Sequence, residues 1–317
     1  MKFPKAPVVM IGYTRVDTML QALRRLSLCN GVDDRDLYLV LDAPAHEGHR
    51  AASNRMLAAA EEFRDKHLPN LKVTRRSENY GVPRNQIESV TEVINRYGRV
   101  IFFEDDVLVS KTFLEFQDEA LEVFKDDKRI FCVNGYYPAF FPEQLKRPKT
   151  DVYVAPRLSA WGVGLWADRW NLVDFEIRSF FEEIKDARLM AEVYRRGHDI
   201  YGMLAAVCRG KLKTWDAQCT YLMAKKGMYA VGPRYRLTKN IGFGGDCLHC
   251  RAHPYFASRK YYNFLPHITT DIKPEKNIFS WYRVNSTYKR FSVIRVLRFL
   301  LKIVSYANPS HLEPYDL

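Results

Sequence analysis

Short apolar runs and longer segments with helical spacing alternate along the chain as far as Tyr137. The short runs are typical of buried strands, which are predicted at residues 7–13, 37–41, 71–74, 100–103 and 130–133. The segments between them predict helices at residues 17–26, 51–67, 83–97 and 112–124, with Asp17 as the cap of the first. Strands that alternate with helices in this way predict an α/β fold with a mainly parallel sheet flanked by helices.

The pattern changes beyond Tyr137, where aromatic residues and prolines accumulate. The motif Trp161-Gly-Val-Gly-Leu-Trp166 interrupts the alternation, and a helical stretch is predicted at residues 175–196. A glycine-rich loop follows at Asn240–Asp246. Its composition is typical of a mobile segment or of backbone that lies close to a ligand.

The C-terminal residues 276–317 are predicted to form a basic, amphipathic tail with a helix at about residues 287–306. Arg295, Arg298 and Lys302 form a narrow basic stripe along this helix, and apolar residues occupy the remainder. Such a helix is suited to an anionic membrane surface. Packing of the same helix against the folded domain is an equally good interpretation of the pattern.

Three carboxylates, Glu104, Asp105 and Asp106, follow the apolar strand at residues 100–103 without a break. We call them the acidic cluster. Like charges are costly to bury together, so these side chains must reach solvent, a cation or a ligand. The carboxyl end of a strand is where open α/β sheets bind ligands, and a hard divalent ion that holds a diphosphate suits such a cluster. The alternative is an acidic turn that caps the helix predicted at residue 112.

The net charge of +12 over 317 residues predicts an anionic partner such as a phosphorylated substrate or a membrane surface. No nucleic-acid-binding motif is present, so nucleic acid is not an expected partner. The six scattered cysteines fit a reducing compartment. Neither a signal-peptide pattern nor an apolar run of about 18 residues occurs. The predicted location is therefore cytoplasmic, with the tail as a candidate peripheral attachment to the inner face of the cell membrane.

The order of several motifs resembles that of GT-A glycosyltransferases over about residues 7 to 250. The closest likeness is to inverting enzymes similar to N-acetylglucosaminyltransferase I and to bacterial relatives that build surface polysaccharides. The motifs are Asp42 after the second strand, Asn79-Tyr-Gly81 before a helix, the acidic cluster, Trp161–Trp166, Trp215-Asp216, Gly227–Pro233 and Asn240-Ile-Gly-Phe-Gly244.

The resemblance implies a GT-A type, Rossmann-like fold, with a catalytic domain at residues 1–275 and the tail at 276–317. A nucleotide-binding half would extend to about residue 137 and an acceptor half from about residue 138. The implied activity is metal-dependent, inverting transfer of a hexosyl or N-acetylhexosaminyl group from a nucleotide sugar to a glycan or lipid-linked saccharide. A UDP-sugar is the favoured donor, and polysaccharide biosynthesis is the implied process.

The resemblance also implies roles for individual residues. Asp106 would bind Mn²⁺ or Mg²⁺, with His249 as a further candidate metal ligand, and Asp216 would be the catalytic base. The remaining implied residues bind the nucleotide sugar: Arg15, Asp42, Asn79, Arg84, Glu104, Asp105 and Trp161. Within this set, Glu104 and Asp105 would face the ribose or the donor sugar, and Arg15 and Asp42 the nucleotide base.

Two other functions and one structural role remain as alternatives. A sugar nucleotidyltransferase generally has a glycine-rich phosphate loop after its first strand, whereas this turn contains only Gly12. A non-catalytic sugar-binding protein would not need the complete set of acidic residues found here. Asp216 itself is either a base, with Trp215 shielding it or stacking on a sugar, or a simple cap of the helix predicted from Ala217.

Overall fold

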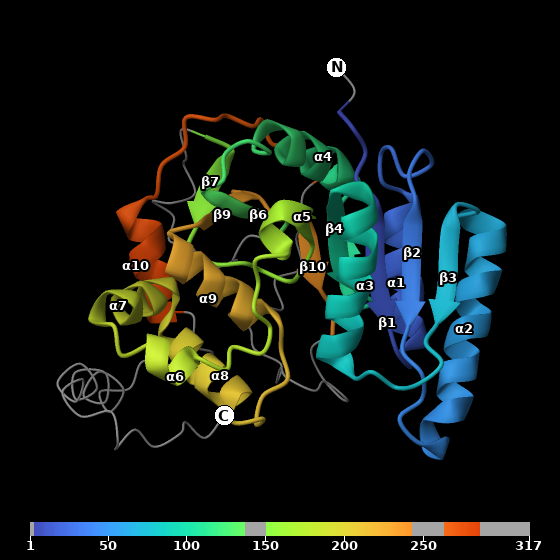
Figure 1. The fold of residues 1–317 in the computed structure, drawn as a ribbon. Coiled ribbons are helices and arrows are strands. Elements are labelled where there is room, and N and C mark those ends of the chain that lie inside the picture. The colour runs from blue at the N-terminus through green and yellow to red at the C-terminus, as the bar shows by residue number, and fades with distance from the viewer. Residues whose placement is uncertain (1–2, 137–149, 243–262, 286–317) are drawn as a thin grey trace.

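The computed structural model describes residues 3–136, 150–242 and 263–285, which form a central sheet with helices on both faces (Figure 1). The eight strands of this sheet follow the order β3-β2-β1-β4-β8-β6-β9-β7. Their bounds are β1 (Val8–Gly12), β2 (Leu37–Leu41), β3 (Leu71–Arg75), β4 (Arg99–Glu104), β6 (Ile130–Asn134), β7 (Val152–Ala155), β8 (Val163–Trp166) and β9 (Tyr229–Pro233). A separate antiparallel pair is formed by β5 (Val107–Val109) and β10 (Thr238–Asn240).

The central sheet is mostly parallel, as the sequence predicts. Strands β3, β2, β1 and β4 are parallel neighbours, and β6 is parallel to β9. Strand β8 joins these two groups through antiparallel pairing with β4 and β6, and β7 is an antiparallel edge strand beside β9. The mixed α/β architecture is therefore confirmed, and the carboxyl ends of β1, β2, β4, β6 and β9 share one edge of the sheet.

Alternating residues of β4 show how the helices cover both faces. Ile101 and Phe103 belong to a core shared with α1 (Val16–Ser27), α2 (Glu47–His67) and α4 (Phe113–Val123). Val100 and Phe102 belong to the opposite core, with α3 (Val82–Tyr97), α9 (Asp216–Lys226) and α10 (Lys276–Asn285). The remaining helices are α5 (Ala167–Trp170), α6 (Phe180–Glu183), α7 (Ala187–Arg196) and α8 (His198–Cys208).

Several boundaries differ from the sequence-based expectation. The first helix begins at Val16 after Arg15, so the expected cap at Asp17 is wrong and this residue lies in the first turn. Helix α2 begins at Glu47, one turn before the expected start. The helix expected at residues 175–196 is broken into α6 and α7, because the Asp186 side chain accepts hydrogen bonds from the amides of Arg188 and Leu189 and caps a new helix.

Helix α10 is the first part of the predicted tail, and it packs against the domain. Ile278 is fully buried and Tyr282 nearly so, and the Tyr282 hydroxyl lies 3.1 Å from that of Tyr153 on β7. Arg234 also forms an ion pair with Glu275, just before the helix. The expected amphipathic helix at residues 287–306 lies outside the described residues, and none of the described helices is long and apolar enough to cross a bilayer.

Candidate functional site

The acidic cluster occupies the turn between β4 and β5. Glu104 ends β4 and is half-buried, whereas Asp105 and Asp106 are 4% and 7% exposed. Strand β5 begins at Val107 and pairs with β10, and the amide of Ile241 donates to the carbonyl oxygen of Asp106 at 2.8 Å. A strand therefore follows the cluster directly. The alternative of an acidic turn that caps the next helix is wrong, because α4 begins only at Phe113.

Arg15 lies on the acidic cluster. Its Nη2 atom donates to Asp105 Oδ1 at 2.7 Å and to Asp106 Oδ2 at 2.9 Å. This contact arises because β1 is the parallel neighbour of β4, with Ile11 paired to Glu104, and Arg15 follows β1 by one short turn. Sequence reasoning placed Arg15 at the nucleotide base. In the structure it is the counter-ion of two carboxylates, and a contact with the base stays a prediction.

The cluster contains more negative charge than Arg15 offsets. Burial, together with the charges of Asp106 and Asp105, raises the pKa of Glu104 to about 8. Burial also raises the pKa of Asp105 to about 7, although the Arg15 guanidinium opposes this shift. On α3, Gln86 Nε2 donates to Glu104 Oε1 at 2.5 Å, a contact that no sequence motif indicated. The excess charge favours a bound cation.

The start of the glycine-rich loop packs directly on Asp106. Asn240 Nδ2 donates to Asp106 Oδ1 at 3.2 Å, and the amide of Gly242 donates to Asn240 Oδ1 at 2.7 Å. A Cβ atom at Gly242 would lie 2.0 Å from Asp106 Oδ2, so glycine is required for this close approach. The loop thus begins against the cluster, and the rest of it, including His249, lies outside the described residues.

The side chain of Trp215, which precedes Asp216, packs in the core of the sheet. This side chain is 2% exposed, and its ring lies edge-on to Phe102 at 5.4 Å and to Trp170 at 5.6 Å between centroids. Trp215 is therefore a core residue, and the expectation that it stacks on a sugar is wrong. Phe102 precedes Glu104 by two positions on β4, so this packing brings the start of α9 towards the acidic cluster.

Asp216 is the first residue of α9 and is partly exposed. Its Oδ1 atom accepts hydrogen bonds from the Thr214 hydroxyl and, at 2.9 Å, from the amide of Ala217. Trp215 is the N-cap, so Asp216 does not occupy the capping position. Oδ2 makes no hydrogen bond to the described residues. The charge of Asp216 also contributes to the raised pKa of Glu104, so the two carboxylates lie near each other.

Arg157 and Asp199 complete this side of the site, and neither was marked by a motif. Arg157 Nη1 donates to both oxygens of Asp199 at 2.9 Å, and Asn134 Nδ2 holds the Arg157 carbonyl oxygen at 3.1 Å. Burial alone would lower the pKa of Arg157, but the charges of Asp199 and Asp216 outweigh it and the pKa is raised. Asp199 is an alternative base in this region, but both of its oxygens are bound to Arg157.

Asp42 follows β2, and its carboxylate binds the turn at Asn79–Gly81 that begins α3. Asp42 Oδ1 accepts from the amides of Ala43 and Tyr80, at 2.9 and 2.8 Å. Its Oδ2 accepts from the amide of Gly81 at 2.8 Å and from Asn79 Nδ2 at 3.1 Å. Gly81 has φ +72°, a conformation that glycine adopts readily. These four bonds give Asp42 a structural role, and a contact with the nucleotide base stays a prediction.

Replacing Asp42 with asparagine is expected to lower the free energy of unfolding by about 1–3 kcal/mol, the usual cost of leaving a buried donor unpaired. The amide group of asparagine cannot accept the two bonds that one carboxylate oxygen now receives. Chemical denaturation measures the loss. Asp33→Asn, at an exposed position, is the control and should change stability by no more than about 0.5 kcal/mol. Equal losses in both variants would contradict the structural role.

Arg84 and Trp161 make no described contact with the acidic cluster. Arg84 pairs with Glu88 at 2.7 Å on the surface of α3, and its guanidinium lies 3.6 Å from the ring centroid of Tyr80. Trp161 is half-buried and edge-on to Tyr136, and its carbonyl oxygen accepts from Thr238 Oγ1 at 2.7 Å. Roles for these residues in nucleotide-sugar binding stay predictions.

The donor set of the cluster fits a hard divalent ion. Asp105 and Asp106 supply carboxylate oxygens, the ligands that Mg²⁺ and Mn²⁺ prefer, and the cluster has excess negative charge. Across residues 3–136, 150–242 and 263–285, no group of three His, Cys, Asp or Glu side chains is arranged to hold a metal. One or two carboxylates are sufficient when substrate phosphates and water complete the coordination, as is usual for Mg²⁺.

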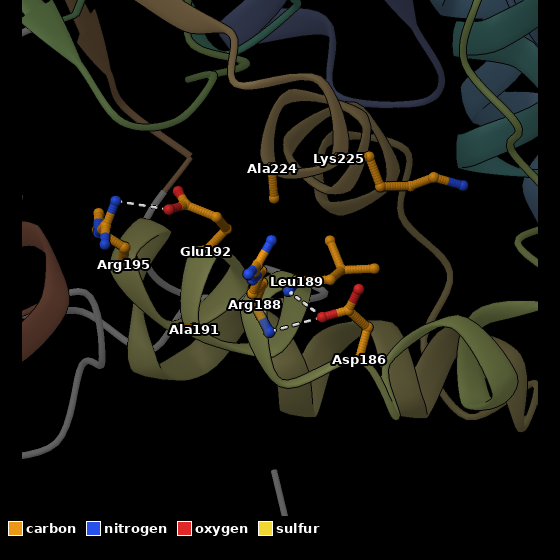
Figure 2. Close-up of a pocket in the computed structure, with 8 residues that line it drawn as sticks. All are labelled: Asp186, Arg188, Leu189, Ala191, Glu192, Arg195, Ala224 and Lys225. Carbon is orange, nitrogen blue, oxygen red and sulfur yellow. Dashed lines mark hydrogen bonds and ion pairs between the residues drawn. The ribbon is translucent and has the colours of Figure 1, made fainter.

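A shallow hollow of about 460 Å³ lies elsewhere, between α7 and the C-terminal part of α9 (Figure 2). Charged residues line much of it, and Arg195 pairs with Glu192 at 2.5 Å there. Lys225 also lines it, nine positions beyond Asp216 on α9. The hollow contains no member of the acidic cluster, so we do not assign the site to it.

No protein-family model matches the sequence, and no curated protein is similar to it. Among solved structures, the chain is similar to the mannosyltransferase PcManGT of Pyrobaculum calidifontis in complex with GDP-Man and Mn²⁺, at 16% identity and a TM-score of 0.38. This match covers 53% of this chain and 46% of that one. The chain is also similar to S. aureus TarS 1–349 in complex with UDP, at 17% identity and a TM-score of 0.38. This match covers 61% of this chain and 55% of that one.

The galactosyltransferase LgtC, in complex with donor and acceptor sugar analogs, is similar at 11% identity and a TM-score of 0.35, with 68% and 70% of the two chains covered. The chain spans about half the length of PcManGT and TarS. Similarity at this level does not assign an activity to the chain. The finer likeness to N-acetylglucosaminyltransferase I stays a prediction from the sequence motifs.

Proposed function

We propose that this protein is a metal-dependent, inverting glycosyltransferase that moves a sugar from a nucleotide sugar to a glycan or lipid-linked acceptor. One observation carries the proposal. A cluster of carboxylates suited to a cation and a separate carboxylate with an uncommitted oxygen lie at the same end of the sheet. They come from different halves of the chain, and the charge of Asp216 acts on Glu104. Inverting transfer needs one group that stabilises the leaving diphosphate and, apart from it, a base that takes the proton of the acceptor hydroxyl.

The acidic cluster would serve the leaving group. Asp106, with Asp105, would hold Mn²⁺ or Mg²⁺ beside the donor diphosphate. When bound, the metal supplies positive charge that stabilises the departing nucleoside diphosphate. Glu104 and Asp105 would also bind hydroxyl groups of the ribose or the donor sugar. Gln86 supports this role because its amide fixes one oxygen of Glu104 and leaves the other for a ligand.

Asp216 would serve the acceptor. Hydrogen bonds from Thr214 and Ala217 hold Oδ1, which leaves Oδ2 to take the proton of the attacking hydroxyl. The position of Asp216 at the start of α9 is set by the buried Trp215. An inverting reaction requires the base and the metal on opposite sides of the donor sugar, and the two halves of the chain supply them separately.

The finer aspects of the proposal follow from the sequence. The net charge of +12 favours a phosphorylated donor and an anionic membrane surface, and a UDP-sugar is the favoured donor. The motif order supports a role in surface polysaccharide biosynthesis, with attachment to the inner face of the cell membrane through the C-terminal tail.

A thermal-shift screen of UDP, GDP, CMP and dTDP sugars, each with and without Mn²⁺, tests the proposal. We expect UDP-sugars with Mn²⁺ to stabilise the protein by about 2.7 kcal/mol at a hundredfold excess over Kd, with little effect when Mn²⁺ is omitted. The active donor should then release nucleoside diphosphate in the presence of an acceptor. Stabilisation without any release would favour a sugar-binding protein, and pyrophosphate formation would favour a nucleotidyltransferase.

A further inference from the structure

The contacts of Arg15 indicate more than a static ion pair. We infer that Arg15 is an internal counter-cation, which must leave Asp105 and Asp106 before a divalent metal binds there, and which then pairs with the phosphates of the donor. The inference rests on the metal site proposed above and adds to it a residue that controls metal affinity.

The geometry of the contact makes Arg15 and a metal alternatives to each other. A single nitrogen, Nη2, bridges Asp105 Oδ1 and Asp106 Oδ2, at 2.7 and 2.9 Å. A divalent ion held by these two carboxylates would bind the oxygens that Nη2 now contacts, at a shorter distance than a hydrogen-bond donor. The guanidinium and the ion would then be in contact, and their like charges repel each other. Both cations therefore cannot occupy this position together.

Of the three side chains in this contact, only that of Arg15 is exposed enough to move away from the other two. The side chains of Asp105 and Asp106 are 5% and 10% exposed, whereas that of Arg15 is 38% exposed. The Arg15 backbone is fixed, because its carbonyl oxygen accepts from the amide of Met19 at 3.1 Å and from Thr18 Oγ1 at 3.0 Å. A rotation of the Arg15 side chain towards solvent opens the cation position without disturbing β4 or α1.

The Asn240–Gly242 segment closes the other side of Asp106. Asn240 Nδ2 holds Asp106 Oδ1, which keeps the carboxylate orientated when Arg15 leaves. A Cβ atom at Gly242 would lie 3.0 Å from Arg15 Nη1, so this backbone also limits where the guanidinium moves. The exit that remains lies on the solvent side, where a bound diphosphate would offer new anionic partners.

This arrangement predicts that metal and nucleotide assist each other. Metal alone has to displace Arg15 into water, which weakens metal binding. Metal that arrives with a diphosphate displaces Arg15 onto phosphate oxygens, so binding is tighter. By linkage, the factor by which UDP raises Mn²⁺ affinity equals the factor by which Mn²⁺ raises UDP affinity. Removal of the Arg15 charge should abolish most of this coupling.

Mn²⁺ titrations followed by electron paramagnetic resonance, with and without UDP, test the inference. Without UDP, Arg15→Gln should lower the Kd for Mn²⁺ at least tenfold relative to the wild type. UDP should tighten Mn²⁺ binding markedly in the wild type and much less in Arg15→Gln. Arg50→Gln is the matched control, because it removes an equal charge from an exposed arginine that pairs only with Glu47 among the described residues. This control should bind Mn²⁺ with the same Kd as the wild type, both with and without UDP.

A second measurement covers the case in which Arg15→Gln folds poorly without metal. Its melting temperature should then be low in EDTA and should rise with Mn²⁺ by more than that of the wild type. The inference is overturned if Arg15→Gln binds Mn²⁺ no more tightly than the wild type, or if Mn²⁺ fails to restore its stability. If the wild type itself binds no Mn²⁺ even with UDP, the proposed metal site is wrong as well.

Discussion

Asp106→Asn is expected to abolish sugar transfer while the protein remains folded. A neutral amide is a poor ligand for a hard divalent ion, so the variant should lose Mn²⁺ binding. A metal that stabilises the leaving group contributes several kcal/mol to the barrier, and about 1.4 kcal/mol corresponds to a tenfold change in rate. Turnover should therefore fall by at least about 10³-fold.

The fold should tolerate this change because Asp106 belongs to a group of crowded carboxylates. Its charge is one cause of the raised pKa of Glu104, so its removal should move that pKa down from about 8 towards the ordinary value. The side-chain oxygen of asparagine still accepts from Asn240. We expect a melting temperature in EDTA close to that of the wild type.

Turnover, Mn²⁺ titration and thermal melting together check this prediction. Asp126→Asn, at an exposed position just after α4, removes an equal charge and should leave all three unchanged. Full turnover of the wild type after thorough removal of metal with EDTA would contradict the metal requirement itself. Loss of folding in Asp106→Asn would instead assign the residue a structural role.

Asp216→Asn should reduce turnover by about 10²–10⁴, the range expected for removal of a general base. Asparagine keeps an oxygen that accepts from the Thr214 hydroxyl and from the amide of Ala217, so the start of α9 should be preserved. The variant should bind donor and metal like the wild type. The loss should therefore be confined to kcat, as expected when proton transfer alone is impaired.

Asp199→Asn is the informative comparison, because Asp199 is acidic and lies in the first turn of α8, on the same side of the site. Its carboxylate is bound through both oxygens to Arg157, so the substitution should lower stability more than Asp216→Asn and affect turnover less. Near-normal turnover in Asp216→Asn, together with a large loss in Asp199→Asn, would transfer the role of base to Asp199.

The first half of the fold was predictable because its signals are local. Strands β1, β2 and β4 are mostly apolar runs that are buried in the sheet, and the edge strand β3 alternates apolar Leu71 and Val73 with polar residues. Strands β7, β8 and β10 have three or four residues each, and they exist only through pairing with strands distant in sequence. No periodicity develops over so few positions, so these three strands were not predicted, whereas the longer β6 was.

The residues of the candidate site also differ in how far the sequence pointed to them. Glu104, Asp105 and Asp106 were singled out because carboxylates directly after an apolar run require a reason, and Asp216 because of the resemblance to GT-A glycosyltransferases. The partners of these residues were not identified. Gln86 lies on a helix with an ordinary amphipathic pattern, and Arg157 is one of 49 lysines and arginines. Arg15 was singled out but assigned to the nucleotide, because its contact depends on the register between β1 and β4.

The packing of α9 on both sides has a consequence for how acceptor preference can diverge. One face of the helix, with Cys219 and Met223, joins the core of the sheet, and the other, with Ala217 and Tyr221, joins a separate small core built by α6, α7 and α8. Substitutions within that small core can reshape the surface around α9 while Trp215 keeps the start of this helix packed on Phe102 of β4. If α9 carries the proposed base, acceptor preference could then change in evolution without altering the distance between Asp216 and the acidic cluster.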